Sequence, residues 1–236
     1  MRTCRARSES ILVSDQKISV GGASVTTDSD AHSEAIVFVI DDDASVRTAL
    51  KDLFESVKLK VSPFASAAEF LRYKKIPDKS CCMVLDVRMP EMSGLKLQEE
   101  LAKARIEVPI VFLTGQGDIA MAVAAMKAGA VDFIVKPFRT QHLLDAVFAA
   151  LERDRVRRNQ QETLVTLRER FSALTLREKE VLLLVAAGRL NKQTALDLGI
   201  SETMVKVHRA NGLRKLHANS VGELVRMTDL LNANPC

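Results

Sequence analysis

Five short apolar runs alternate with helical patterns between residues 35 and 150, and this alternation limits the possible folds more than any other feature. The apolar runs predict strands at 35–40, 59–61, 81–86, 109–113 and 131–135. The helical patterns follow at about 46–57, 67–73, 95–104, 118–128 and from 140 to beyond 151. Uninterrupted apolar runs of this length are typical of strands covered on both faces. The pattern therefore predicts an α/β fold with a five-stranded, parallel, doubly wound sheet.

Polar side chains are predicted to gather where four of these strands end. Asp41 and Asp42 follow the first strand, Asp86 ends the third, Thr114 follows the fourth and Lys136 follows the fifth. Ligands of open α/β sheets bind at this carboxyl edge. Crowded carboxylates repel one another unless a cation lies among them, and hard oxygen ligands suit Mg2+. A carboxylate held in this way can attack phosphorus, while the hydroxyl and the ammonium contact phosphoryl oxygens.

Bulk composition is that of an ordinary soluble chain with room for two small domains, with 236 residues, 47% hydrophobic and 27% charged. The apolar runs are too short to span a bilayer, and the N-terminus lacks the apolar core of a secretion signal, so we expect a cytoplasmic protein without membrane contact. The four cysteines show no metal-ligand spacing. We interpret them as reduced thiols.

The positive charge is concentrated in the last third of the chain. Residues 35–150 hold 15 Lys or Arg and 15 Asp or Glu, whereas residues 151–236 hold 15 Lys or Arg against 10 Asp or Glu. The excess of +5 after residue 150 indicates a polyanionic partner there.

The region after residue 150 reads as helical throughout. A 3-4-3 spacing of Leu164, Leu167, Phe171 and Leu174 suggests a linker helix over 151–173, either a coiled coil or a helix packed on a domain. Residues 174–236 are predicted to form an all-α domain of four helices. These are expected at 176–187, 192–198, 202–216 and from a Ser220 cap to about 231. The turn Gly199-Ile200-Ser201 between the second and third helices is typical of a helix-turn-helix. Residues 1–34 are expected to be a disordered extension.

Residues 35–150 resemble the receiver domain of two-component response regulators, which has a flavodoxin-like fold. The resemblance is carried by Asp41-Asp42, Asp86 with Pro90 and Gly94, Thr114-Gly115, and Phe133 ahead of Lys136-Pro137. It implies that Asp86 is the phosphoacceptor. It also implies Mg2+ binding by Asp42, Asp86, the backbone carbonyl of Arg88 and, through water, Asp41. Thr114 and Lys136 would contact the phosphoryl group, Phe133 would change rotamer, and the Lys136-Pro137 bond would be cis.

Residues 174–231 resemble the LuxR-type helix-turn-helix, and the whole chain resembles FixJ-like response regulators. The motif runs through Leu174-Thr175, Glu178, Gly188, Asn191-Lys192, Ile200-Ser201, 205–209, Asn211 and Lys215-Leu216. Helical spacing puts Val205, Leu213 and Leu216 toward the core. The DNA-binding residues expected on the opposite, groove-facing side are Thr203, Lys206, Val207 and Ala210, with phosphate contacts from Lys192, Arg209, Asn211 and Lys215.

Three positions depart from the family's usual pattern. Met204 stands where Thr is common, Thr194 where Ile is usual, and Gly212 where a bulky aliphatic is usual. Glycine inside a helix costs roughly 1 kcal/mol relative to alanine. These departures put the stability of the helical domain in question.

The resemblance implies a transcription regulator and not an enzyme. A sensor histidine kinase would phosphorylate Asp86, and the face formed by 118–128, 131–135 and 140–151 would then form a homodimer that binds double-stranded DNA; RNA polymerase is a further expected partner. In the resting state the receiver would mask the DNA-binding domain or keep it monomeric. A second class stays open, in which the receiver only dimerises. A third, an enzyme with a nucleotide cofactor, rests on Gly115-x-Gly117-x-x-Ala120, which follows the wrong strand for a dinucleotide fingerprint.

Overall fold

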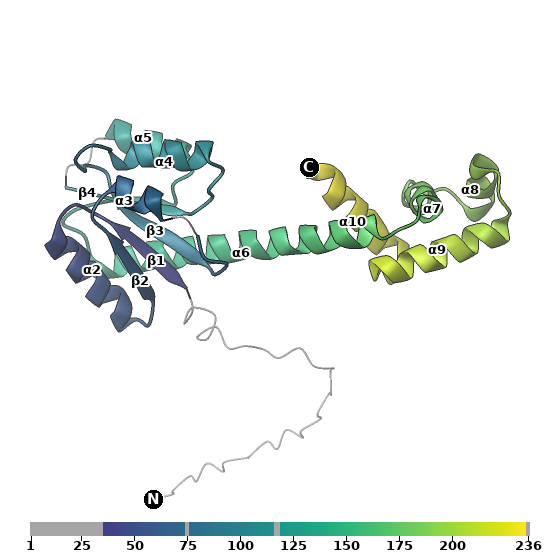
Figure 1. The fold of residues 1–236 in the computed structure, drawn as a ribbon, viewed down its shortest axis with the longest axis horizontal. Coiled ribbons are helices and arrows are strands. Elements are labelled where there is room, and N and C mark those ends of the chain that lie inside the picture. Colours follow the sequence, from purple (N-terminus) through teal and green to yellow (C-terminus); the bar gives the residue numbers. More distant parts are fainter. Residues whose placement is uncertain (1–34, 74–75, 116–118, 235–236) are drawn as a thin grey trace, which may run out of the picture.

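The computed structural model describes residues 35–73, 76–115 and 119–234. Its first domain is a sheet of five parallel strands in the order β2-β1-β3-β4-β5. The strands are β1 Ile36–Ile40, β2 Lys60–Phe64, β3 Cys81–Asp86, β4 Ile110–Thr114 and β5 Asp132–Val135. The helices around them are α2 Ala44–Ser56, α3 Ala67–Arg72, α4 Gly94–Lys103, α5 Ile119–Lys127 and α6 Thr140–Ser172. The predicted α/β class and doubly wound architecture are confirmed (Figure 1).

Helices cover both faces of the sheet, as the unbroken apolar strands require. On one face α3, α4 and α5 bury the side chains of Phe38, Met83 and Phe112. On the other face α2 and α6 bury those of Val39 and Val84. Because β3 is central, all six of its residues are buried. Asp86 therefore lies at the end of a strand that is enclosed on both faces of the sheet.

Strand β2 is longer than predicted. It extends to Phe64 and contains Pro63, which pairs with Val39 of β1. Proline cannot donate a backbone hydrogen bond, but β2 is the outermost strand, where one side of the ladder needs no partner. The polar Ser62 followed by Pro63 made this strand appear shorter in the sequence than it is.

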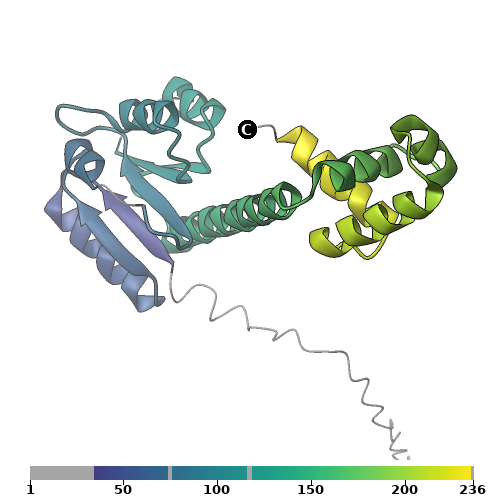
Figure 2. The ribbon, with the colours of Figure 1, turned by 45° about the vertical axis from the view of Figure 1, so that its right-hand side comes forward.

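Helix α6 runs without interruption for 33 residues from the sheet to the C-terminal helices (Figures 1 and 2). Its first half packs on the sheet through Leu143, Val147 and Leu151. In its second half Leu167 is buried and Phe171 packs on the C-terminal core, so the alternative of a helix packed on a domain is the one observed. The helix does not break between residues 150 and 151, and the proposed domain boundary at that point stays a prediction.

The C-terminal region consists of α7 Leu176–Ala186, α8 Asn191–Leu198, α9 Glu202–Leu216 and α10 Val221–Ala233. They enclose a separate core that includes Val181, Leu182, Val205 and Leu216. Side-chain caps begin three of the helices: Thr175, Ser201 and Ser220 each accept a hydrogen bond from a backbone N–H three residues on. Among the described residues, no helix is both long and apolar enough to cross a membrane.

Candidate functional site

The carboxyl edge of the sheet brings together three of the predicted residues in direct contact. The Lys136 ammonium, just beyond β5, lies 2.8 Å from Asp41 Oδ2 and 3.3 Å from Asp86 Oδ1. Asp41 follows β1, and Asp86 is the last residue of β3. These residues are distant in sequence, and they meet because parallel strands end at the same edge.

Backbone donors hold the two carboxylates in place. Asp41 Oδ1 accepts a hydrogen bond of 2.9 Å from Asp43 N, and Asp86 Oδ2 accepts one of 2.8 Å from Arg88 N. Both aspartates are buried, whereas Asp42 and Arg88 at the same edge are exposed. The Asp43 side chain caps α2 by accepting hydrogen bonds from the backbone N–H groups of Ser45 and Val46.

The electrostatics of Asp86 and Lys136 reflect a site partly shielded from water. Burial raises the pKa of Asp86, and the charge of Asp41 adds to this, while Lys136 opposes it. Burial lowers the pKa of Lys136, but its hydrogen bonds and ion pairs with Asp41 and Asp86 outweigh burial and leave that pKa raised. Lys136 is therefore a fixed positive charge at neutral pH, in contact with the Asp86 carboxylate.

Thr114 and Phe133 lie on neighbouring strands beside this cluster. Thr114 is fully buried at the end of β4, and its carbonyl accepts a 2.7 Å hydrogen bond from Lys136 N. Phe133 on β5 is partly buried, with its ring centroid 6.1 Å from that of Phe112. The Lys136-Pro137 bond is cis, as the resemblance implied.

Gly94 is required by the close approach of the loop after β3. Its backbone N–H donates a 3.0 Å hydrogen bond to Val87 O, and a Cβ atom at this position would collide with the backbone oxygen of Asp86. Only glycine lets the start of α4 lie against the strand end that carries Asp86. The glycine therefore fixes the loop that leads from Asp86 through Pro90.

The donor chemistry of this edge fits Mg2+. Asp41 and Asp86 present carboxylate oxygens side by side, and their shared contact with one Lys136 ammonium indicates that a positive charge stabilises them together. Within the described ranges, no three Asp, Glu, His or Cys side chains lie close enough to form a ready metal cluster. Mg2+ commonly uses only one or two carboxylates and keeps several waters, so the pair meets its requirement.

The second predicted site lies on α9. Thr203, Lys206, Val207 and Ala210 are all exposed on one side of this helix, while Val205 and Leu216 are fully buried. Helix α9 follows the turn 199–201 after α8 and lies beyond the far end of α6 from the sheet (Figures 1 and 2). The predicted division into a core side and an outer side is therefore observed.

The residues predicted to contact phosphates have more varied surroundings. Lys192 is exposed. Arg209 Nη1 donates a 3.3 Å hydrogen bond to Asn191 Oδ1, and Asn211 Oδ1 accepts one of 3.2 Å from an arginine one turn on. Lys215 lies 2.7 Å from the buried carboxylate of Glu178. Lys215 thus joins α9 to α7, a structural role that sequence reasoning missed.

Of the three unusual residues, Gly212 is explained by packing, Thr194 is buried without a hydrogen bond for its hydroxyl, and Met204 is exposed with no structural explanation. At Gly212 a Cβ would lie 2.7 Å from Leu182 Cδ1, so the leucine of α7 already fills the space that a larger residue would need. Thr194 is fully buried on α8. Within the described part of the chain, its Oγ1 is the one buried side-chain oxygen or nitrogen without a hydrogen-bond partner.

Asp154 is a further structural residue that the sequence did not reveal. It is fully buried on α6, accepts a 2.9 Å hydrogen bond from Cys81 N and pairs with Arg157 and Arg158 at 2.6 Å each. The spacing to the two arginines is visible in the sequence, but the contact with the start of β3 is not. Cys81 itself is a free, buried thiol whose pKa burial raises to about 11, consistent with an unreactive cysteine.

The α/β domain and the C-terminal helical domain each match a known protein family. Residues 37–148 match the response regulator receiver domain, and residues 172–228 match the bacterial regulatory proteins of the luxR family. A receiver domain followed by this type of helix-turn-helix defines a two-component response regulator that regulates transcription.

Individual similar proteins show which group of response regulators this chain belongs to. Nodulation protein W of Bradyrhizobium diazoefficiens is 52% identical over 86% of this chain and 88% of its own length. The transcriptional regulatory protein FixJ of Azorhizobium caulinodans is 43% identical over 84% and 94%. The solved structure of the response regulator StyR aligns with a TM-score of 0.75 and 47% identity, over 83% of this chain and 98% of that one. The chain belongs to the FixJ-like response regulators, a family of transcriptional regulators.

Proposed function

We propose that phosphorylation of Asp86 by a sensor histidine kinase controls dimerisation and sequence-specific DNA binding by this regulator. The observation that carries the proposal is the Lys136 ammonium, held between the buried carboxylates of Asp41 and Asp86. A receiver domain implies a histidine kinase partner, and the luxR-family domain implies DNA as the target.

Asp86 is proposed as the nucleophile. One of its carboxylate oxygens would form a bond to the phosphorus of a phosphohistidine on the kinase, the phosphorus–nitrogen bond would break, and the histidine nitrogen would keep that electron pair. The Arg88 N–H holds one oxygen of Asp86, which limits rotation of the carboxylate. Lys136 would stabilise the negative charge that develops on the phosphoryl oxygens.

Mg2+ is proposed as the cofactor. Asp42, Asp86 and the Arg88 carbonyl would hold it, with Asp41 acting through water. When bound, the ion supplies charge neutralisation at the transferring phosphoryl group. Asp42 is exposed at the strand end, so it is accessible to a hydrated ion.

Thr114 and Phe133 are proposed to pass the change to an exposed apolar face. Movement of Thr114 toward the phosphoryl group would vacate space into which the Phe133 ring turns. The dimer face is proposed on α5, β5 and the start of α6. Its exposed apolar residues are Ile119, Val123, Met126 and Val135, and such a patch favours association.

The exposed side of α9 is proposed to enter the DNA major groove. Lys206 is the candidate for a base edge, and Val207, which is 46% exposed, could contact a thymine methyl. The residues proposed to contact phosphates are Lys192, Arg209, Asn211 and Lys215. Lys215 would either leave Glu178 to bind a phosphate or contact Glu178 and the phosphate at the same time. Since the outer side of α9 is already exposed, dimerisation is favoured over unmasking as the control step.

The test is to measure molecular mass and operator binding of the full chain with and without beryllofluoride and Mg2+, where beryllofluoride on Asp86 stands in for a phosphoryl group. We expect a shift to dimer and tighter binding in the wild type, and neither in Asp86→Asn. Glu91→Gln, a change to an acidic side chain in the loop beyond Asp86, is the matched control and should respond as the wild type does.

An unchanged mass and affinity in the wild type would contradict the proposal. If the chain were already dimeric and bound DNA equally with and without beryllofluoride, the receiver would be a dimerisation module only. Radiolabel transfer from a small phosphodonor separates a chain that is not phosphorylated from one that is phosphorylated without consequence.

A further inference from the structure

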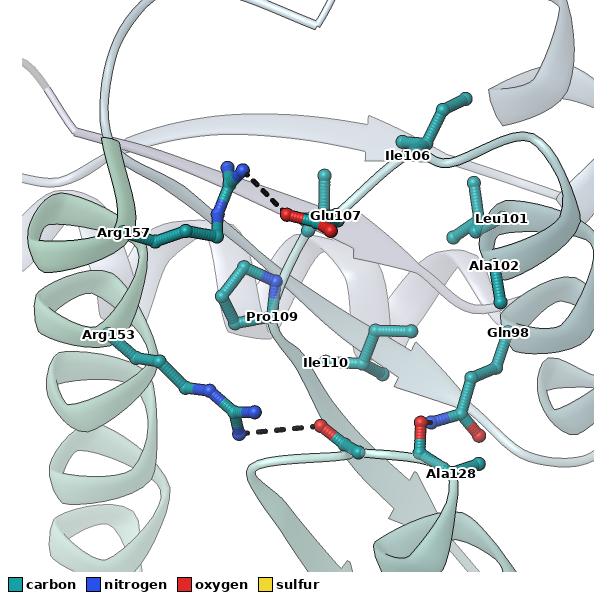
Figure 3. Close-up of a pocket in the computed structure, with 12 residues that line it drawn as sticks. Gln98, Leu101, Ala102, Ile106, Glu107, Pro109, Ile110, Ala128, Arg153 and Arg157 are labelled. Carbon is teal, nitrogen blue, oxygen red and sulfur yellow. Dashed lines mark hydrogen bonds and ion pairs between the residues drawn. The ribbon is translucent and has the colours of Figure 1, made fainter. Parts of the chain in front are cut away.

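A cavity of about 380 Å³ opens at the amino edge of the sheet, opposite the edge that holds Lys136 (Figure 3). It lies between the ends of α4 and α5, the start of β4 and the middle of α6. Its volume falls within the range of small-molecule sites, roughly 300–1,000 Å³. Nothing in the phosphorylation or DNA-binding scheme uses it.

The cavity combines an apolar surface with a few polar groups at its rim. Leu101, Ile106, Pro109 and Ile110 are among its apolar lining residues. Gln98 is buried in the wall, and its amide nitrogen donates hydrogen bonds of 3.3 Å and 3.2 Å to two backbone carbonyls at the end of α5. The Gln98 amide group is therefore committed to holding α4 against α5.

The charges around the cavity do not balance. Arg157 Nη1 lies 3.1 Å from Glu107 Oε2, and Arg157 Nη2 lies 2.6 Å from Asp154 Oδ1. Arg153 contacts only the Gly129 carbonyl, at 3.4 Å, and no carboxylate in the described ranges pairs with it. In Figure 3 both guanidinium groups extend from α6 toward the cavity. Asp154 also pairs with Arg158, at 2.6 Å, so these two carboxylates are shared by two other arginines. The exposed Arg153 guanidinium is left without a carboxylate partner among the described residues beside the apolar surface.

We propose that this cavity binds a small monocarboxylate with an apolar alkyl or aryl body. The Arg153 guanidinium would donate two parallel hydrogen bonds to the carboxylate, the geometry that arginine favours for this group. The apolar body would lie against Ile106, Pro109 and Ile110. Glu107 at the rim repels ligands of higher negative charge, so a monoanion is preferred over a phosphate ester or a nucleotide.

A ligand in this position connects two elements that matter elsewhere in the molecule. Arg153 is on α6, which continues to the DNA-binding helices, and Ile110 begins β4, which ends at Thr114. The bound carboxylate would therefore tie α6 to the amino end of β4. The proposal does not depend on phosphorylation of Asp86, because it uses the opposite edge of the sheet.

The test is a titration of the full chain, labelled at isoleucine δ-methyl groups, with 3-phenylpropionate in the absence of Mg2+ and beryllofluoride. We expect saturable NMR shifts of Ile106 and Ile110, and none of Ile134 or Ile200, which lie in the other two cores. The neutral analogue 3-phenylpropionamide should bind at least about tenfold more weakly, because it lacks the charge that pairs with arginine. Equal binding of acid and amide, or no saturable shift, would overturn the proposal.

Two arginine variants sharpen the result. Arg153→Gln should weaken binding of 3-phenylpropionate by about tenfold or more. Arg155→Gln is the matched control, because Arg155 is exposed on the same helix, pairs with Glu152 and does not line the cavity. If both variants bind as tightly as the wild type, Arg153 is not the carboxylate partner and the assigned site is wrong.

Discussion

Replacing Thr194 by valine is expected to stabilise the DNA-binding domain. The Thr194 side chain is fully buried, and its Oγ1 has no hydrogen-bond partner. Burying a hydroxyl without a partner costs roughly 1–3 kcal/mol by mutational data. Valine has nearly the same shape and a similar helix propensity, so that cost is removed with little else changed. The expected gain is therefore about 1–3 kcal/mol in the free energy of unfolding.

Calorimetry of the full chain, with hydrogen exchange of residues 174–234 to identify the transition, measures this gain. A gain of 1 kcal/mol raises the Tm of a domain of this size by roughly 4–8 °C. Thr166→Val is the matched control, because Thr166 is exposed on α6 and burial imposes no cost on its hydroxyl; we expect a change within about 0.5 kcal/mol. An unchanged or lowered Tm for Thr194→Val would show that the hydroxyl carries no penalty, and the reasoning would fail.

Three other changes follow from the same contacts. Gly212→Ala gains about 1 kcal/mol of helix propensity but places a Cβ 2.7 Å from Leu182 Cδ1, so we expect a net loss of about 1–2 kcal/mol in urea unfolding. In a Leu182→Ala background, which is itself destabilised, Gly212→Ala should no longer lower the stability. Asp154→Asn breaks two ion pairs of a fully buried carboxylate, so we expect it to lower the free energy of unfolding of the receiver by on the order of 3 kcal/mol. Hydrogen exchange at the start of β3 should also become faster. Burial raises the pKa of Asp86 in the folded protein above its ordinary value of 3.8, so the folded state binds the proton more tightly and stability falls as pH rises from that value through the raised pKa. Asp86→Asn should remove this fall and be more stable at neutral pH; an equal or steeper fall in the variant would contradict the assigned shift.

The receiver fold was predictable because its strands are short, apolar and separated by helical patterns. The positions of Asp41, Asp86 and Lys136 followed from one rule, that parallel strands end at the same edge. The sequence could not reveal that Lys136 bridges both carboxylates at once, since that depends on side-chain reach across the sheet. The roles of these residues stay predictions until they are measured.

The helical half shows where sequence reasoning falls short. Gly212 looked destabilising when judged by helix propensity, and its compensation by Leu182 is a contact between two helices that no local pattern encodes. Lys215 was assigned to DNA because basic residues on a recognition helix usually are, yet its ammonium meets a buried glutamate of α7. Contacts between side chains of different helices thus determine what these residues do, and residue type and local sequence pattern do not reveal such contacts.

Because α6 is unbroken, one continuous helix connects the receiver to the C-terminal helices. Its 33 residues span about 50 Å, and each residue turns the helix by about 100°. The number of residues between the sheet and α7 therefore sets the angular phase of α9 relative to the receiver. One inserted residue would rotate α9 by about 100° relative to the receiver and so misalign the two recognition helices of the proposed dimer. Seven inserted residues would lengthen α6 by about 10 Å and change the phase by only about 20°.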